Sequence, residues 1–137
     1  MAVSVVVDTN VIVYLLLRTE PFRAECDEFW QAASGAGAPE HWAAEFSNAI
    51  WRAVQAGLIT AASADVRLVA AERLQITSVR TADLWHGALA RSASTGLAVY
   101  DTLFVELAEQ SGCPLVTFDA AVLRAYPGVA RRPRELS

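Results

Sequence analysis

The chain has 137 residues, 54% of them hydrophobic, and fifteen acidic residues against eleven basic ones give a net charge of −4. This length favours a single domain over residues 1–137 with a substantial core, and the hydrophobic content excludes a disordered chain. The acidic balance argues against a protein that simply coats nucleic acid, whereas an acidic pocket neutralised by a divalent cation is compatible with it.

The first predicted element is a short strand over residues 3–7, which is β-branched and apolar like a strand buried on both faces of a parallel sheet. A helix is expected to follow through residues 14–17. Asp8 ends the first apolar run, and the next run, residues 11–17, is far shorter than the roughly 20 residues of a membrane span. An export signal requires a basic residue before its apolar stretch, and no basic residue precedes the first run. We therefore expect a cytoplasmic protein without a membrane segment.

The middle of the chain is predicted to be mostly helical. One helix is expected over residues 21–33, with Pro21 in its first turn, and a brief strand near residues 37–38 follows the glycine-containing stretch 34–37. The next helix covers residues 40–56, with Gly57 as its C-cap. A further helix over residues 62–73 precedes a strand over residues 74–79.

The last third continues the alternation of helices and short strands. Helices are expected over residues 81–94 and 100–110, a strand over 115–118, a short helix over 119–126 and a final strand over 128–130. This alternation predicts βαβ crossovers and a parallel sheet covered on both faces. The basic tail, residues 131–134, is expected to lie in solvent. Cys26 and Cys113 have no ligand-type spacing and are expected as core residues, with one disulfide between them as the alternative.

Two aspartates follow predicted strands of the sheet. Asp8 comes directly after the first strand and Asp119 after the strand through residue 116. Ligands of such sheets bind beyond the carboxyl ends of the strands, so both side chains are expected at one edge. Either residue alone has an ordinary alternative, which is to cap the next helix. Two carboxylates at one edge repel each other unless a cation lies between them.

Two more acids are candidates for the same place. Glu45 lies at the border of the apolar stripe of its predicted helix, in line with Asn48 and Arg52. Its alternative is a solvated face or a weak ion pair with Arg52. Asp101 opens a helix that is apolar on most sides, where it is either a cap or a buried ligand, because a buried charge is costly unless it is paired.

Four carboxylates without cysteine or histidine specify a hard cation, Mg²⁺ or alternatively Mn²⁺, rather than zinc. Such a site orients a water molecule, lowers its pKa and stabilises a leaving oxygen, which suits hydrolysis of a phosphodiester. The hypothesis is that one or two Mg²⁺ ions bind the acids and that water attacks phosphorus in line. The four acids are Asp8, Glu45, Asp101 and Asp119.

The order and spacing of four short segments resemble the PIN-domain nucleases and, within them, the VapC-type toxins of bacterial toxin–antitoxin pairs. Each segment is weak alone, but together they extend over nearly the whole chain. The segments are residues 5–10 (Val-Val-Val-Asp-Thr-Asn), 45–49 (Glu-Phe-Ser-Asn-Ala), 100–104 (Tyr-Asp-Thr-Leu-Phe) and 116–119 (Val-Thr-Phe-Asp).

The resemblance implies an α/β fold, a three-layer α/β/α sandwich around a short, mainly parallel sheet. It implies RNA as the substrate, a small antitoxin protein as the partner and a homodimer as the assembly. It also implies the acidic quartet as catalytic residues, with Glu45 acting through water and Asp8, Asp101 and Asp119 as metal ligands. Thr9, Asn10 and Thr117 resemble the family's polar support, with ordinary turn and cap bonding as the alternative.

Other functions fit the sequence less well. A metal-independent ribonuclease needs general acid and base groups, usually histidines, and both His41 and His86 are expected to be structural or surface residues. Aspartyl phosphatases carry a second aspartate where Asn10 stands, and receiver domains use a late lysine, which this chain lacks. The alternative from another class is a catalytically silent PIN-fold module that binds RNA or protein. Trp51, opposite the apolar stripe, is expected to be exposed at an interface or packed on a neighbouring helix.

Overall fold

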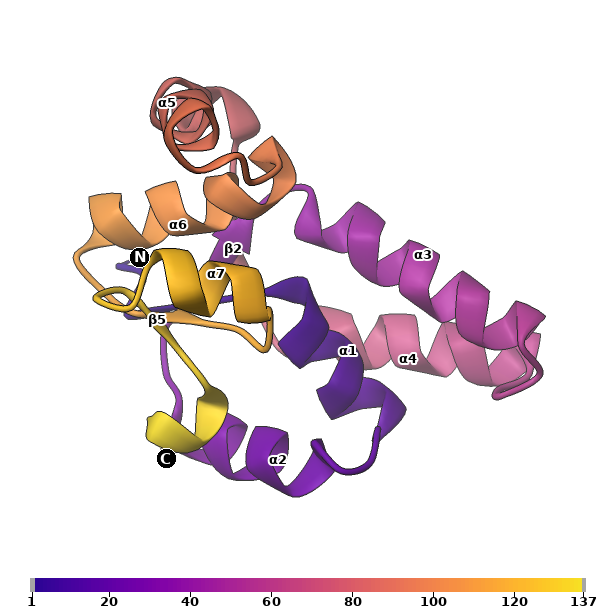
Figure 1. The fold of residues 1–137 in the computed structure, drawn as a ribbon. Helices are drawn as coiled ribbons and strands as arrows, with labels where there is room; N and C mark the ends of the chain where they lie inside the picture. The colour runs from indigo at the N-terminus through magenta and orange to yellow at the C-terminus, as the bar shows by residue number, and fades with distance from the viewer. Residues whose placement is uncertain (1, 137) are drawn as a thin grey trace.

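The computed structural model describes residues 2–136, which form a parallel sheet between two layers of helices (Figure 1). The strand order is β3-β2-β1-β4-β5, and every neighbouring pair is parallel. This confirms the predicted three-layer α/β/α sandwich. The strands are β1 (Val5–Val7), β2 (Ala36–Pro39), β3 (Thr77–Val79), β4 (Leu115–Val116) and β5 (Ala130–Arg131).

The helices agree with the predicted order, with small differences at their ends. The second helix begins at Arg23 and leaves Pro21 in the preceding turn, and the segment 81–94 is divided at Leu84 into a 3₁₀ turn and a helix. Gly57 follows its helix with φ +76°, a backbone conformation that favours glycine. The helices are α1 (Thr9–Leu17), α2 (Arg23–Ala32), α3 (Trp42–Gln55), α4 (Ala61–Arg73), η1 (Thr81–Asp83), α5 (Trp85–Thr95), α6 (Val99–Ser111), α7 (Ala120–Ala125) and η2 (Pro133–Glu135).

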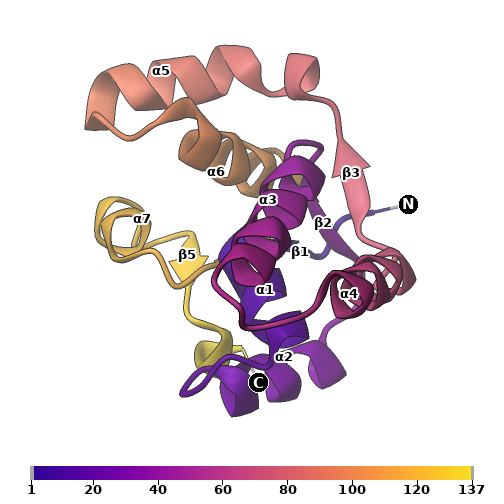
Figure 2. The same ribbon diagram turned by 90° about the vertical axis from the view of Figure 1, so that its right-hand side faces the viewer.

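The path of the chain defines a switch point between β1 and β4. From β1 the chain steps outward through β2 to β3, whereas from β4 it steps the opposite way to β5. Right-handed crossovers then place α1, α2, α3 and α4 on one side and α5, α6 and α7 on the other. Figure 2 shows this division, with α5 and α6 on one side of the strands and α1, α2 and α4 on the other. Ligand sites of such sheets lie where the direction reverses.

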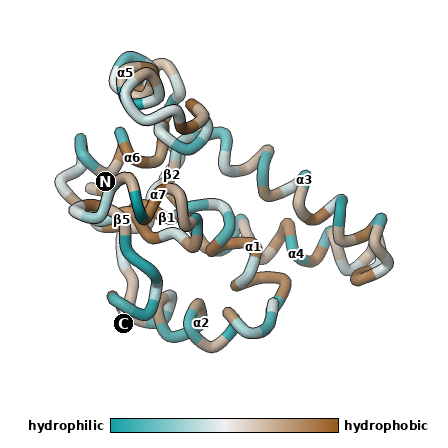
Figure 3. The backbone as a smooth tube through the Cα atoms, in the orientation of Figure 1, coloured by the Kyte–Doolittle hydropathy of each residue, from teal (hydrophilic) through white to brown (hydrophobic). Residues whose placement is uncertain are grey.

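The core centres on the two middle strands. Val6, Val7, Leu115 and Val116 are completely buried, because helices cover both faces of the sheet. Helix α1 is hydrophobic over most of its length, while α2 is largely hydrophilic, as the colours of Figure 3 show. In residues 2–136 no helix combines the length and the apolar character that crossing a membrane requires.

Two predictions at the periphery are decided by the structure. Cys26 and Cys113 are both free, so the alternative of a disulfide between them is excluded. The expectation that residues 131–134 lie in solvent is wrong for Arg131, Arg132 and Pro133, whereas Arg134 is exposed. Pro133 is buried, and the Arg132 guanidinium is bound to Glu25 on α2, because this pairing brings the basic tail back onto the helix.

Candidate active site at the carboxyl edge of the sheet

Asp8 lies at the centre of the carboxyl edge, between β1 and β4. Its backbone N–H donates to the Val116 carbonyl at 2.9 Å, and only 9% of the residue is exposed. It occupies the N-cap position of α1, yet its side chain makes no capping bond. The capping alternative therefore does not explain this aspartate.

A polar network holds the Asp8 carboxylate in place. The Thr117 hydroxyl donates to Asp8 Oδ2 at 2.7 Å and itself accepts from the Asp119 N–H at 3.0 Å. The Asn10 amide lies 3.4 Å from both Asp8 Oδ2 and the Thr117 hydroxyl, while its oxygen accepts from the Phe118 N–H at 3.3 Å. Asn10 and Thr117, predicted as supporting residues, thus contact Asp8 or its neighbours directly.

Glu45 reaches the same edge from the first turn of α3. Trp42 and Phe46, on the other side of this part of α3, are buried, while the Glu45 side chain is 40% exposed. Its Oε1 accepts from the Thr9 hydroxyl at 2.8 Å, a contact between residues 36 positions apart. The structure shows no ion pair between Glu45 and Arg52 in residues 2–136. The predicted support by Thr9 therefore acts on Glu45 rather than on Asp8.

The remaining two acids sit at the starts of α6 and α7. Asp119 is the N-cap of α7, and its Oδ1 accepts from the N–H groups of Ala121 and Val122 at 2.8 and 3.2 Å. Asp119 therefore does cap α7, and it does so through Oδ1 and not through Oδ2. Asp101 is the third residue of α6, whose N-cap position belongs to Ala98, so Asp101 is not a cap.

The electrostatics join the four acids into one cluster. Burial raises the pKa of Asp8 to about 7; the Thr117 hydrogen bond opposes this rise, and the charges of Glu45 and Asp101 add to it. Burial likewise raises the pKa of Asp101, and the charges of Asp119 and Glu45 raise it further. Each acid is thus close enough to another to oppose its ionisation, and no arginine contributes to either shift.

The donor set fits a divalent cation by its chemistry. It consists of carboxylate oxygens supported by hydroxyl and amide groups, and Asp8 is buried without a cationic partner. In residues 2–136, however, no three His, Cys, Asp or Glu side chains are arranged to hold one ion together. Binding of an ion would therefore have to draw these carboxylates closer than they lie here.

Sequence reasoning did not identify the contacts of His41 at this edge. The residue is expected to be structural or at the surface, and the structure shows a mostly buried ring whose Nε2 lies 3.5 Å from Glu45 Oε1 and 3.1 Å from the Tyr100 carbonyl oxygen. The spacing of four residues from Glu45 along a helix was the available signal. His86 is exposed on α5, as expected for a surface residue.

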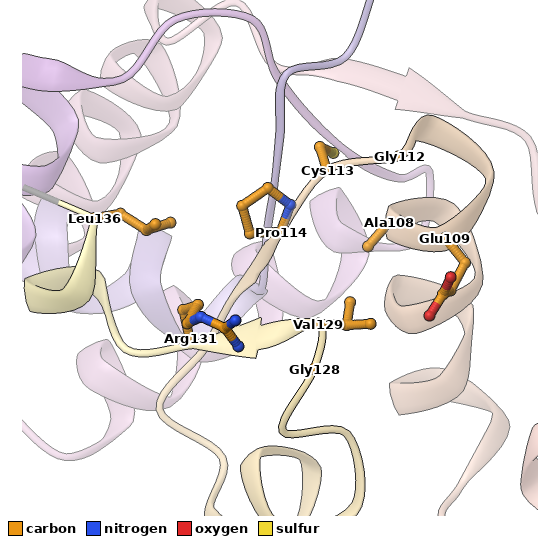
Figure 4. A pocket seen from close by; sticks show the side chains of 9 residues that line it. All are labelled: Ala108, Glu109, Gly112, Cys113, Pro114, Gly128, Val129, Arg131 and Leu136. Atoms are coloured by element: carbon orange, nitrogen blue, oxygen red, sulfur yellow. The ribbon is translucent and has the colours of Figure 1, made fainter.

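A cavity of about 460 Å³ lies elsewhere, near the starts of β4 and β5 (Figure 4). Cys113 and Pro114 precede β4, and Gly128 and Val129 precede β5, so this cavity is at the amino edge of the sheet. Asp8 follows β1 at the opposite edge. The cavity is therefore separate from the acidic cluster.

Comparisons with known proteins agree with this geometry. Residues 5–128 match the family described as PIN domain. Ribonuclease VapC3 of Mycobacterium tuberculosis, in strains CDC 1551 / Oshkosh and ATCC 25618 / H37Rv, is 36% identical over 124 residues, which cover 90% of this chain and 88% of the relative. The crystal structure of PAE2754 from Pyrobaculum aerophilum superimposes with a TM-score of 0.74 at 25% identity, over 95% of this chain and 84% of that one.

Proposed function

Because the chain belongs to the PIN-domain family and is a VapC-type member of it, we propose that it is a Mg²⁺-dependent endoribonuclease, the toxin of a type II toxin–antitoxin pair. The observation that carries this proposal is the cluster of four acids around the buried Asp8, whose charges oppose one another without an arginine among them. The similarity to Ribonuclease VapC3 over most of both chains supports RNA as the substrate.

The four acids divide the work in this proposal. Asp8, Asp101 and Asp119 would hold the cation, and Glu45 would act on it through water. Mg²⁺, or Mn²⁺ in its place, would supply charge stabilisation at the phosphate and activation of water. Thr117 and Asn10 fix the Asp8 carboxylate, so that it is oriented before substrate binds.

Partners follow from the same assignment. We expect a cognate antitoxin to silence the toxin by placing a cationic group at the acidic cluster, where it would replace the missing counter-charge. We also expect a homodimer. Trp51 on α3 is 56% exposed and offers an aromatic contact for one of these partners. A cytoplasmic location stays a prediction.

Cleavage of total cellular RNA with and without EDTA tests the activity. We expect cuts that require Mg²⁺ and products with 5′-phosphate and 3′-hydroxyl ends, because water rather than the ribose 2′-hydroxyl is the nucleophile. Products with 2′,3′-cyclic phosphate ends, or full activity in EDTA, would contradict the proposal.

A variant pair separates an enzyme from a silent binding module. Asp8→Asn should lower the rate of cleavage about 1000-fold while RNA binding, measured by gel shift, survives. Asp65→Asn makes the same chemical change on the exposed face of α4 and serves as the matched control, with cleavage unchanged. If the wild-type protein binds RNA without ever cutting it, the binding module is the correct function.

A further inference from the structure

His41 connects two segments of the acidic cluster that are far apart in the sequence. Its Nε2 lies 3.1 Å from the Tyr100 carbonyl oxygen, next to Asp101, and 3.5 Å from Oε1 of Glu45 on its own helix. Both of these oxygens are hydrogen-bond acceptors. Nε2 must therefore carry a proton, which it donates to the Tyr100 carbonyl, while Glu45 Oε1 lies within ion-pair distance of the same nitrogen.

The surroundings of the ring fix its orientation. Its edge packs on Phe104 with 5.0 Å between ring centroids, and the Tyr100 ring lies at 5.7 Å. The side chain is only 14% exposed, and Nδ1 is buried without a hydrogen-bond partner in residues 2–136. The packing of the ring and the bond from Nε2 to the Tyr100 carbonyl therefore hold the imidazole in one orientation.

The contact constrains Glu45 together with Thr9. The Thr9 hydroxyl and His41 Nε2 both approach Oε1 of Glu45, at 2.8 and 3.5 Å. The other carboxylate oxygen, Oε2, has no hydrogen bond within the described part of the chain. One oxygen of Glu45 is thus held by the protein, and the other is left for water or an ion.

We propose that His41 is a positioning residue, whose Nε2–H donates to the Tyr100 carbonyl and lies against Glu45 Oε1, and which thereby sets the separation of Glu45 from the Asp101 turn. This inference rests on the proposed function. Groups that orient metal ligands through a hydrogen bond affect the affinity for the ion although they never touch it. His41 would act in that way, between α3 and the start of α6.

Three substitutions at residue 41 distinguish the effect of the Nε2–H from the effect of ring packing. His41→Gln places an amide N–H close to the position of Nε2, whereas His41→Asn places its amide near the unpaired Nδ1. His41→Phe keeps the packing on Phe104 but has no N–H. The affinity for Mn²⁺ by isothermal titration calorimetry, kcat and KM on RNA, and the melting temperature are measured for each variant.

We expect His41→Asn and His41→Phe to weaken Mn²⁺ binding about 10- to 100-fold and to lower kcat without changing KM for RNA. His41→Gln should restore both values most of the way to wild type. Unchanged Mn²⁺ affinity in His41→Asn would overturn the inference. A loss in His41→Gln as large as in His41→Phe would overturn it too, because ring packing would then be the cause.

A measurement on the metal-free protein keeps this inference separate from the proposed function. Long-range ¹H–¹⁵N NMR of the imidazole should show a proton on Nε2 of His41. The backbone amide signal of Asp101 should shift in His41→Asn and not in His41→Gln. If the wild type neither binds Mn²⁺ nor cuts RNA, the proposed function fails, and these spectra still decide whether His41 holds the two segments. A proton on Nδ1 alone would show that it does not.

Discussion

The fold shifts the pKa values of two carboxylates in opposite directions. One is the buried Asp8 at the carboxyl edge, and the other is the partly buried Glu25 under the C-terminal segment. Burial and, to a smaller extent, the charges of neighbouring acids raise the pKa of Asp8 to about 7. Burial also acts to raise the pKa of Glu25, but hydrogen bonds from Arg132 and the backbone of Arg134 outweigh it, so the pKa is lowered. One carboxylate is neutralised by the chain, and the other is not.

The surroundings of Glu25 show what a structural acid receives. Arg132 binds it through two nitrogens, Nη2 at 2.6 Å and Nε at 3.1 Å, and the Arg134 N–H adds a bond at 3.1 Å. The same guanidinium lies over the Phe118 ring, 4.8 Å from its centroid. We call Glu25, Arg132, Arg134 and Phe118 the C-terminal clasp.

The difference indicates function at the carboxyl edge. The chain has eleven arginines and places one of them on Glu25 with bidentate geometry, yet none of them contributes to the pKa shifts of Asp8 or Asp101. Unpaired buried charge is costly and is characteristic of sites that bind or react. The comparison therefore predicts that changes in the two regions will affect different properties.

Catalysis should give the largest contrast. Asp8→Asn should lower the rate of RNA cleavage by about 1000-fold, on the order of 4 kcal/mol of transition-state stabilisation, because in the proposed function it removes a cation ligand. Arg132→Met should leave the rate within a few-fold of wild type, since the clasp lies outside the cluster. Initial rates at saturating Mg²⁺ measure both. An equal loss in Arg132→Met would break the distinction between the regions.

Stability should move in the opposite direction for the same Asp8 variant. The folded-state pKa of about 7 lies above the ordinary value of 3.8. Below pH 4 Asp8 is therefore protonated, and it does not lower the stability of the folded protein. The cost of its ionisation grows as the pH rises and is complete above pH 7. Asp8→Asn should therefore be more stable than wild type at pH 8 by about 2–4 kcal/mol. The advantage should shrink towards pH 4. Urea unfolding in EDTA at pH 8 and pH 5 measures it, and a less stable variant at pH 8 would contradict the assignment.

The clasp should respond with the reverse sign. Arg132→Met leaves the partly buried Glu25 without its ion pair, although the backbone N–H of Arg134 still binds it, and we expect the free energy of unfolding to fall by about 1–3 kcal/mol at pH 7. Because the folded-state pKa of Glu25 is lowered, its contribution is present above the ordinary value of 4.5 and is lost as the pH falls through the folded-state value. The difference between wild type and Arg132→Met should narrow below pH 4. A double-mutant cycle with Glu25→Gln isolates the pair, and additive losses would show that the two residues do not interact.

The comparison also separates what the sequence can predict from what it cannot. The strands around Val6 and Val116 were predicted from short β-branched runs, because a sheet buried on both faces requires such runs. The place of Asp8 and Asp119 at one edge followed from the parallel topology alone. These features depend on local pattern and on a general rule of chain connection.

The missed features depend on long-range side-chain contacts. The Thr9–Glu45 bond joins residues 36 apart, His41 reaches Tyr100 across 59 positions, and Arg132 reaches Glu25 across 107. No periodicity encodes such pairs, so the basic tail was wrongly expected in solvent. The four acids as catalytic residues stay a prediction, because the structure gathers their charges but does not place three of them around one ion.

Magnesium should give the smallest effect and the most specific one. At a free concentration roughly ten times its dissociation constant, Mg²⁺ should stabilise the wild-type protein by about 1.4 kcal/mol at pH 8, a rise in Tm of a few degrees. Arg132→Met should show the same rise from its lower starting Tm, because the clasp holds no cation. Asp8→Asn should show none, although its starting Tm is higher. Differential scanning calorimetry with and without Mg²⁺ gives all three values. An equal rise in Asp8→Asn would mean that the ion binds elsewhere, and the unpaired charge at the carboxyl edge would then need another explanation.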